Sequence, residues 1–375
     1  MELANKKVLV VGLGTTGVST ARFAKNRGAD VTVTDTADEY DLQEAVAAMH
    51  NHGIRTQLGG HVPEIFAETD LVVVSPGVPH TIEPLELARQ KGIPVLGEVE
   101  LASRFLAAPI VAVTGTNGKT TTTGLVGEML KKSGRSVFVG GNIGCPLIDA
   151  VEQNKKVDVV VAEISSFQLD TIETFRPRIG VLLNIAEDHL DRYPDLQAYA
   201  RSKARLFENQ QPGDVAILNG SDALAMEITK HIQSRKLVFI ADGNQSQQPR
   251  EGAVVTAKGI EFRLPATFTG TDEHSNATSV ESRRRGTILS SQIGLFGSHN
   301  LENAAAAALA ALAAGGTWQG VQSALRDVRP LAHRLEFVTS VDSVHYYNDS
   351  KATNVDAVAR ALECFDQPVI CLLYT

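Results

Sequence analysis

The stretch VAVTGTNGKTTT at Val111–Thr122 determines how the rest of the chain is interpreted. The apolar run Ile110–Val113 predicts a buried strand, and the helical spacing of apolar residues in Thr121–Lys132 predicts a helix. Between them lies a tight turn bounded by glycines, made of Gly115, Thr116, Asn117 and Gly118. A strand, a Gly-rich turn and a helix N-terminus in this order direct main-chain N–H groups and the helix dipole at an anion.

The side chains after the turn indicate a phosphate ligand. Lys119 adds a positive charge, and the hydroxyl of Thr120 can hold Mg²⁺. The complete P-loop pattern has a further glycine where this chain has Val113, so the motif is a shortened variant. A Gly-rich turn without a ligand is the alternative interpretation.

A second glycine motif, GLGTTG at Gly12–Gly17, follows the apolar run Lys7–Val11. A helix is expected over Val18–Asn26, and a second strand over Asp30–Thr34 ends at Asp35. This order is the dinucleotide-binding fingerprint, with a pyrophosphate at the helix N-terminus and ligand hydroxyls at Asp35. NAD and a diphosphate-linked sugar nucleotide both present these groups. Glycines that only permit close packing are the alternative.

Polar residues also follow other predicted strands. A rigid SPGVP loop, Ser75–Pro79, ends the strand Leu71–Val74. Three later strands are predicted at Ser136–Val139, Val157–Ala162 and Ile179–Leu183. They lead into Asn142, into the run Glu163–Gln168 and into the run Asn184–His189, respectively. Glu163 and His189 suit Mg²⁺ ligation or the orientation of a carboxylate. A lone histidine after a strand is more often structural, but the second polar strand end beside His189 favours the functional interpretation here.

Composition limits the class of protein. The chain has 375 residues, enough for two or three domains, with 43% hydrophobic and 21% charged residues, as in soluble globular proteins. Its net charge of −8 argues against a nucleic-acid-binding surface. Cys145, Cys364 and Cys371 lack metal-ligand spacing and fit a reducing compartment. No signal peptide and no membrane span are expected, so a cytoplasmic protein is predicted.

The second half predicts further α/β structure. Lys203 lies on the helix expected at Leu196–Asn209, between Arg201 and Arg205, and spacing alone predicts only a solvated, charged face. We expect further strands at Val215–Leu218, Leu237–Ile240, Val254–Leu264 and Thr287–Phe296, the last two antiparallel. Polar, mobile loops are expected at Asp242–Gly252 and Thr269–Gly286. Ser298–Asn300 should cap an Ala-rich helix, Leu301–Ala314.

The last part predicts a hairpin and one further βα unit. The hairpin strands are expected at Leu335–Thr339 and Val344–Tyr347, followed by a polar loop and N-cap at Asn348–Asn354. A helix is expected at Val355–Cys364 and a strand at Val369–Leu373.

Taken together, these motifs resemble the Mur ligase family over almost the whole chain. They are GLGTTG, SPGVP, GTNGKTTT, GNIG around Asn142, EISSFQL at Glu163–Leu169, EDHLDRY at Glu187–Tyr193, the SHN of Asn300, His333-Arg334 and NDSKATN at Asn348–Asn354. The resemblance implies a three-domain α/β fold. A Rossmann-like UDP-sugar domain is expected at 1–98, a P-loop ATP domain with a mixed sheet at 99–330, and an incomplete Rossmann-like amino-acid domain at 331–375.

The resemblance also implies site residues. ATP is expected at Gly115, Thr116, Asn117, Gly118, Lys119, Thr120, Thr121, Asn300, Arg334 and Asp349. The UDP-sugar and amino-acid substrates are expected at Gly14, Thr15, Asp35, Thr36, Gly77, Asn142, Ser165, Gln168, Lys351 and Thr353. Catalytic roles fall to Lys119, Glu163, His189 and Lys203, and Mg²⁺ ligation to Thr120, Glu163, His189 and a carbamylated Lys203.

The implied reaction is ATP-dependent ligation of D-glutamate to UDP-N-acetylmuramoyl-L-alanine through an acyl phosphate, by a monomer. Ala332, where a proline is usual, and Leu372–Thr375, where a Gly-rich turn is usual, depart from the family pattern. We therefore expect that the third domain is truncated and that this chain alone does not complete the ligation. Alternatives are a related Mur or folylpolyglutamate-type ligase, an NAD-dependent oxidoreductase with a fused NTPase, and a protein that only binds.

Overall fold

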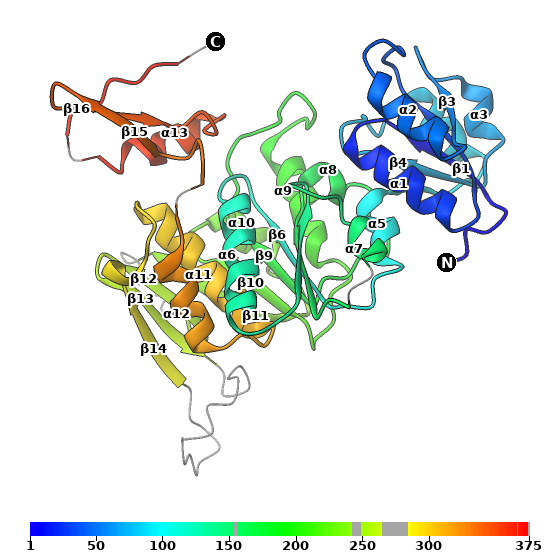
Figure 1. Cartoon of the computed structure of the whole chain (residues 1–375). Helices are drawn as coiled ribbons and strands as arrows, with labels where there is room; N and C mark the ends of the chain where they lie inside the picture. The colour runs from blue at the N-terminus through cyan, green and yellow to red at the C-terminus, as the bar shows by residue number, and fades with distance from the viewer. Residues whose placement is uncertain (154–155, 242–248, 265–283, 330, 366, 374–375) are drawn as a thin grey trace. The chain divides into compact units, whose positions relative to one another are not determined.

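The structure is a computed structural model that describes residues 1–375 except 154–155, 242–248, 265–283, 330, 366 and 374–375. The chain forms two compact units, Met1–Ile110 with Phe138–Arg176 and Val111–Val137 with Pro177–Thr375 (Figure 1). The polar loops expected within 242–252 and 269–286 lie largely outside the described residues. No described helix is long and apolar enough to cross a membrane.

The first unit contains a parallel sheet in the order β3-β2-β1-β4-β5. Its elements are β1 (Lys7–Val11), α1 (Thr15–Asn26), β2 (Asp30–Thr34), α2 (Gln43–Asn51), β3 (Arg55–Gln57), α3 (Pro63–Ala67), β4 (Leu71–Val74), α4 (Glu83–Gln90), β5 (Val95–Gly97) and α5 (Glu98–Ser103). The unit also holds β7 (Val137–Gly141), α7 (Asp149–Glu152), β8 (Val159–Glu163) and α8 (Ser166–Leu169).

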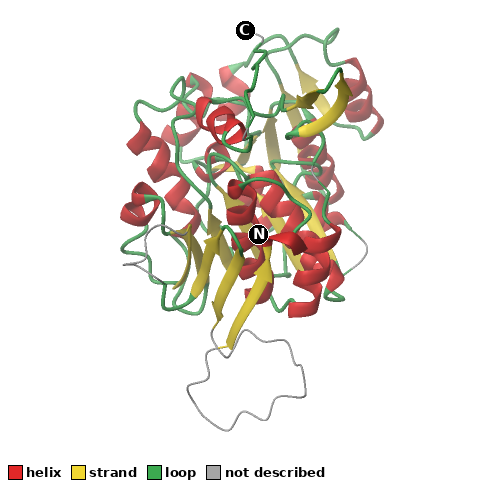
Figure 2. Cartoon of the chain, turned by 90° about the vertical axis from the view of Figure 1, so that its left-hand side faces the viewer, coloured by secondary structure: helices red, strands yellow, loops and turns green. Residues whose placement is uncertain are grey.

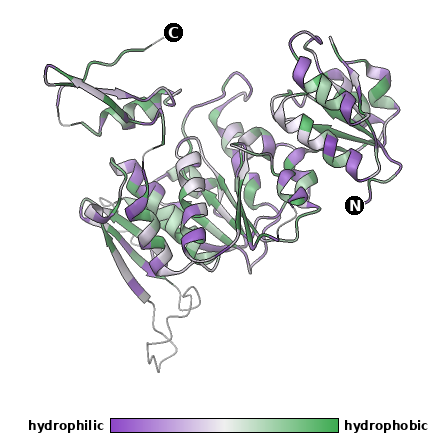
Figure 3. Cartoon of the chain, viewed as in Figure 1, coloured by the Kyte–Doolittle hydropathy of each residue, from purple (hydrophilic) through white to green (hydrophobic). Residues whose placement is uncertain are grey.

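Buried apolar side chains hold this sheet against its helices. Every residue of β4 is buried, as expected for a parallel strand covered on both faces. One core cluster joins β1 and β4 to α3 and α4 through Leu9, Val11, Phe66, Val72, Val74, Leu85 and Ala88. In Figure 3 the β1 and β4 ribbons are accordingly coloured as hydrophobic.

The strands of the second unit follow the order β14-β13-β12-β11-β10-β9-β6. From β6 to β12 they are parallel, and β12, β13 and β14 are antiparallel, so the expected mixed sheet is confirmed. The strands are β6 (Ile110–Thr114), β9 (Ile179–Leu182), β10 (Val215–Asn219), β11 (Arg235–Ala241), β12 (Gly252–Thr256), β13 (Gly259–Leu264) and β14 (Arg284–Leu289), with a separate hairpin of β15 (Glu336–Val341) and β16 (Val344–Asn348).

Helices cover this sheet, as the red and yellow elements of Figure 2 show. The helices of the second unit are α6 (Lys119–Lys132), α9 (Leu196–Ala204), α10 (Ala223–Ile228), α11 (Ser298–Ala313) and α12 (Trp318–Asp327), with α13 (Val355–Leu362) beside the hairpin and short 3₁₀ turns at Arg205–Phe207 and Ser290–Gln292. Helix α11 is buried from Asn303 to Leu312 and packs against α6, α12 and the strands β9 to β13. Its alanines permit this close approach because they carry only a methyl group.

Several predictions of helices and strands were wrong. The single strand Val254–Leu264 is two strands, because the Thr256 hydroxyl accepts from Lys258 N at 3.1 Å and turns the chain. The helix from Leu196 ends at Ala204, where a 3₁₀ turn begins. Strand β14 ends at Leu289 rather than at Phe296. Residues 369–373 form no strand, since no described strand pairs with them.

Candidate active site

The Gly115–Gly118 turn lies between β6 and α6, as the sequence predicts. Gly118 adopts φ +84°, and a Cβ at this position would lie 2.2 Å from Asn303 Oδ1 on α11. Both the left-handed backbone and the close approach therefore require glycine here. The turn leads into the N-terminus of a 14-residue helix, whose dipole favours a negative charge at this end.

Two lysines converge on one main-chain oxygen of the turn. Lys119 Nζ donates to the carbonyl oxygens of Gly115, at 2.9 Å, and of Thr116, at 2.8 Å. Lys203 Nζ donates to the same Gly115 oxygen at 2.9 Å, and its charge lies 4.4 Å from the centre of the Tyr199 ring. Lys203 is only 1% exposed, so the expectation of a solvated helix face was wrong at this position.

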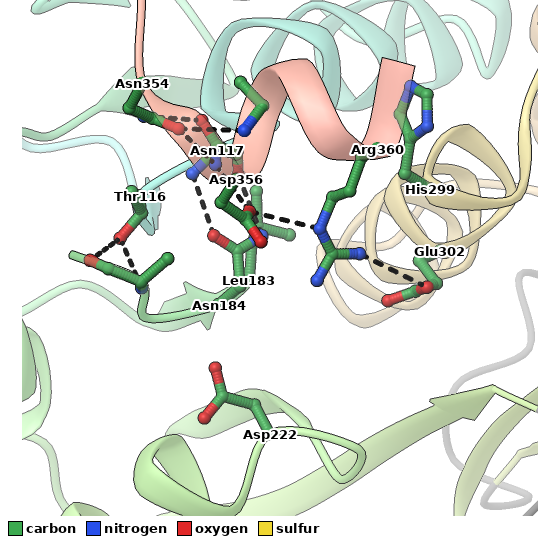
Figure 4. Close-up of polar contacts among 12 residues, drawn as sticks. Thr116, Asn117, Leu183, Asn184, Asp222, His299, Glu302, Asn354, Asp356 and Arg360 are labelled. Carbon is green, nitrogen blue, oxygen red and sulfur yellow. Dashed lines mark hydrogen bonds and ion pairs between the residues drawn. The ribbon is translucent and has the colours of Figure 1, made fainter. Parts of the chain in front are cut away.

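Side chains from neighbouring segments hold the turn. Thr116 Oγ1 accepts from Ala186 N at 3.0 Å and lies 3.4 Å from the hydroxyl of buried Tyr199. Burial raises the pKa of Tyr199, so this residue stays a neutral phenol. Asn184 Oδ1 accepts a hydrogen bond from Asn117 N at 2.8 Å, and Asn184 Nδ2 donates to Asn117 O at 3.1 Å (Figure 4).

A cavity of about 270 Å³ adjoins the turn within the second unit. The residues that the resemblance assigned to ATP and that line this cavity are Asn117, Gly118, Thr120, Thr121, Asn300, Arg334 and Asp349. They come from the P-loop, from α11 and from the segment around the hairpin, which are far apart in sequence. The fold therefore brings these residues to one concave site.

The first turn of α11 differs from the expected cap. Gly297 is the N-cap, with no side-chain capping bond, and Ser298–Asn300 already belong to the helix. Asn300 Nδ2 donates to Phe296 O at 2.7 Å, while Asn300 Oδ1 accepts from Asn303 Nδ2 at 3.3 Å. The amide of Asn300 is thus held in place at the cavity.

Sequence reasoning did not assign the charged residues Glu302 and Arg360, which also line the cavity. Burial raises the pKa of Glu302, against the opposing effect of Arg360, whose Nη1 lies 4.0 Å from Glu302 Oε1. Burial likewise lowers the pKa of His299, one turn earlier on α11. Glu302 lies two residues after Asn300, so proximity to an assigned position was the available signal.

The C-terminal residues with expected roles divide into two groups. Asp349 Oδ1 accepts from Leu335 N at 3.0 Å, and both Arg334 and Asp349 are half-buried at the cavity. Lys351 and Thr353 are exposed and do not line the cavity. Asn354 is the N-cap of α13, as the sequence predicts, and accepts from Ala357 N at 2.9 Å.

In the first unit, Glu163 and Asn142 form a pair. Glu163 is 2% exposed at the end of β8, and its Oε1 accepts from Asn142 Nδ2 at 3.0 Å. Ser165 and Gln168 form a capping box on α8, in which Ser165 N donates to Gln168 Oε1 at 2.9 Å. These two side chains therefore stabilise the local backbone, whatever else they bind.

The fingerprint residues of the first unit surround the N-terminus of α1. Gly17 packs so closely on Gly12 O that a Cβ there would lie 1.8 Å away, so this glycine serves packing. Gly14 has open space around its Cβ position, and Thr15 is exposed beside it. Asp35 Oδ2 accepts from Leu13 N at 2.7 Å, and Asp35 Oδ1 accepts from Ala37 N at 2.9 Å. Thr36 and Gly77 are exposed.

The expected Mg²⁺ residues are chemically suitable in part. His189 is exposed, has φ +55°, and its Nε2 lies 3.8 Å from Asp188 Oδ2. Among the described residues there is no group of three His, Cys, Asp or Glu side chains placed to hold a metal. Mg²⁺ commonly takes only one or two protein oxygens, together with phosphate and water. The Thr120 hydroxyl of the second unit and the Glu163 carboxylate of the first unit are each oxygen donors of the kind that Mg²⁺ takes.

Family comparison agrees with this architecture. The Mur ligase middle domain matches residues 113–311, and the Mur ligase MurD-like N-terminal domain matches residues 6–97. The chain therefore belongs to the Mur ligase family.

Individual relatives extend the match. The chain is 52% identical to a UDP-N-acetylmuramoylalanine--D-glutamate ligase of Desulfosudis oleivorans, covering 100% of this chain and 77% of that protein. A ligase of the same name from Desulfatibacillum aliphaticivorans is 50% identical, over 98% of this chain and 78% of its own length. A pseudomurein peptide ligase type C from Methanothermus fervidus is similar in fold, with a TM-score of 0.57 at 21% identity, covering 96% and 78% of the two chains.

Proposed function

We propose that this protein catalyses the ATP-dependent ligation of D-glutamate to UDP-N-acetylmuramoyl-L-alanine, a step of peptidoglycan precursor synthesis. The proposal rests on the identity of 52% to a relative named for that reaction. The cavity beside the P-loop supports it, because residues of three segments meet there around a helix N-terminus. We further propose that a monomer carries out the reaction in the cytoplasm.

The chemistry requires a carboxylate to be activated. The alanyl carboxylate attacks the γ-phosphorus of ATP, and the bond to ADP breaks to give an acyl phosphate and ADP. The amine of D-glutamate then attacks the acyl carbon, an amide forms, and phosphate and a proton leave. The protein need supply no nucleophile; its part is to position the reactants and to stabilise the transferring group electrostatically.

We assign the nucleotide phosphates to the P-loop. Main-chain N–H groups at the start of α6 would bind phosphate oxygens, and Lys119 Nζ, now on two loop carbonyls, would turn to the transferring group. Lys203 reaches the same loop from α9 and, as a carbamate, would become an acidic partner of the metal site. Asn300 and Arg334 would contact the nucleotide from the other side of the cavity.

Thr120, Glu163, His189 and Lys203 are the residues that we propose hold Mg²⁺. The ion, when bound, neutralises negative charge on the phosphates. Glu163 also has a role of its own, because its buried carboxylate orients the Asn142 amide, which we assign to the UDP-sugar substrate.

The substrate nucleotide is assigned to the first unit. The pyrophosphate would approach at Gly14 and Thr15, where the space around Gly14 is open and the α1 dipole is favourable. Asp35 would meet the uridine with the lone pairs that its two main-chain bonds leave. Gly77, Ser165 and Gln168 are further substrate contacts, and Lys351 and Thr353 would contact the amino acid.

Ligand-induced stabilisation tests the substrate assignment independently of turnover. UDP-N-acetylmuramoyl-L-alanine should raise the melting temperature of the protein, whereas NADH at the same concentration should not. Stabilisation by NADH and not by the UDP-sugar would favour the oxidoreductase alternative instead. A ligation assay with radiolabelled D-glutamate, L-glutamate or L-alanine, on a version of the protein that carries a complete third domain, then tests the amino acid. Incorporation of L-alanine onto UDP-N-acetylmuramate would overturn the assignment.

A further inference from the structure

The side chain of Asn117 in the P-loop forms hydrogen bonds with Asn354 and Asp356 at the start of α13. Its Nδ2 donates to Asp356 Oδ2 at 2.8 Å and to Asn354 Oδ1 at 3.3 Å (Figure 4). Its Oδ1 accepts from Asn354 Nδ2 at 3.2 Å. With both main-chain groups bonded to Asn184, every polar group of Asn117 has a protein partner.

The acceptor on α13 is itself fixed in place. Asp356 lies in the first turn of α13, where the helix dipole favours a carboxylate. Arg360, one turn later, donates from Nε to the same Asp356 Oδ2 at 3.1 Å and reaches Glu302 on α11 with its other end. The Asp356 oxygen is therefore a charged acceptor with a fixed position, which makes its bond to Asn117 a strong one.

Asn354 extends the contact to a second motif. Its Nδ2 also lies 3.5 Å from Asp188 Oδ2, in the loop that precedes His189. Residues 354–356 thus touch the P-loop and the loop after β9 at once. Neither Asn354 nor Asp356 lines the cavity, so their influence on a bound nucleotide would pass through Asn117.

We propose that Asp356, assisted by Asn354, is a positioning residue that holds the P-loop in its nucleotide-binding conformation. The inference rests on the proposed ATP site. A loop that is already ordered loses less conformational entropy when the nucleotide binds, so the contact raises affinity without touching the ligand. By linkage, bound nucleotide stabilises the docked state of α13 to the same extent.

Electrostatic repulsion and the proposed positioning role predict opposite changes in nucleotide affinity when the Asp356 carboxylate is removed. Removal of the Asp356 carboxylate takes a negative charge away from the neighbourhood of the phosphates, so electrostatics alone would tighten nucleotide binding. Loss of a positioning contact would weaken it. The sign of the change in Kd for Asp356→Ala therefore separates the two explanations.

The experiment measures binding of the non-hydrolysable ATP analogue AMP-PNP with Mg²⁺ to the full chain by calorimetry. We expect Asp356→Ala to raise Kd about tenfold, the size of effect of one charge-assisted hydrogen bond. Asp342→Asn, which removes an exposed charge from the turn between β15 and β16, is the control and should leave Kd unchanged. An unchanged or lower Kd for Asp356→Ala overturns the inference.

An exchange of the two partners guards against simple misfolding. Asn117→Asp places two carboxylates against each other and should weaken binding further, whereas Asn117→Asp with Asp356→Asn restores a donor and an acceptor and should recover affinity. Because the double variant keeps the added charge at the P-loop, recovery requires the contact itself. A double variant that binds no better than Asn117→Asp contradicts the proposal.

Hydrogen exchange supplies a readout that does not depend on the calorimetry. The analogue should slow amide exchange in 355–362 of the unmodified chain and not in Asp356→Ala; equal slowing in both would overturn the linkage. If the unmodified chain binds no AMP-PNP at all, the proposed ATP site itself fails, and that result is distinct from normal binding with an inert Asp356.

Discussion

Glu98 provides a test of the electrostatics of the first unit. It lies at the start of α5, is 2% exposed, and its Oε1 accepts from Ile148 N at 2.6 Å. Its Oε2 is buried without a hydrogen-bond partner. Burial raises the pKa of Glu98 from 4.5 to about 7, and the nearby charge of Asp149 acts in the same direction. A carboxyl group in these surroundings is easier to bury protonated than ionised.

The sign of the effect on stability follows from this raised pKa. Between pH 4.5 and about 7 the folded chain holds a proton on Glu98 that the unfolded chain has lost. The free energy of unfolding therefore falls as pH rises through this window and is level again above it. A shift from 4.5 to about 7 corresponds to a loss of about 3 kcal/mol from Glu98 alone.

Glu98→Gln should remove this dependence, because glutamine is close in shape, can still accept from Ile148 N, and does not titrate. Urea unfolding, followed by circular dichroism from roughly pH 5.5 to roughly pH 8, would give the free energy of unfolding at each pH. The unmodified chain should lose stability over this range relative to Glu98→Gln. Glu64→Gln, at an exposed position on α3, is the matched control and should follow the unmodified chain.

The difference between the two pH profiles is the decisive quantity, because the glutamine amide brings a buried donor that costs stability at every pH. If Glu98→Gln and the unmodified chain lose the same free energy between the two ends of the range, Glu98 does not titrate there. The reasoning from its buried and unpartnered Oε2 would then be refuted.

Three further predictions concern single residues. Lys203→Ala should lower the free energy of unfolding by about 2–4 kcal/mol, and Lys203→Met should lower it by less. In a version of the protein that carries a complete third domain, both variants should abolish ligation without rescue by bicarbonate, and normal ligation by either would contradict a role of Lys203 at the Mg²⁺ site. Gly118→Ala should destabilise the fold by about 1–3 kcal/mol in urea unfolding, because Gly118 has φ +84° and lies against Asn303. Gly124→Ala is the control, since the space around the Cβ position of Gly124 on α6 is open, and it should be neutral or stabilising. Asp35→Ala should weaken UDP-sugar binding by about 1–3 kcal/mol in calorimetry, and unchanged affinity would remove Asp35 from the site.

Apolar runs and glycine motifs predicted much of the fold. The strands Lys7–Val11, Asp30–Thr34 and Leu71–Val74 have the predicted bounds, because each is a short β-branched run between polar residues. Helix α12 was not anticipated, although its buried positions Val321, Ala324 and Leu325 follow helical spacing. The strand expected at 369–373 shows the limit of the method, since a strand needs a neighbour to pair with and an apolar run does not reveal one.

The candidate site was less accessible to sequence reasoning. Arg201 and Arg205 flank Lys203 in sequence but point to other faces of the helix, whereas Tyr199, one turn earlier, shares the buried face with it. The sequence prediction considered only the number of charged residues on this helix, not the face on which each one lies. Asp356 was equally hidden, because its role depends on a contact with Asn117 across 239 residues of sequence. Local spacing carries no information about such a pairing.

The shortened P-loop explains why so many distant segments meet at it. Several segments hold the turn: two lysines donate to Gly115 O, the loop after β9 contacts both Thr116 and Asn117, and Asp356 in the first turn of α13 accepts from Asn117. Gly118 packs directly on α11. A turn that is fixed from outside at every position needs little internal structure to keep its N–H groups aligned. Contacts from outside the turn thus fix its backbone, so that loss of one of them should change both the stability of the fold and the alignment of these N–H groups.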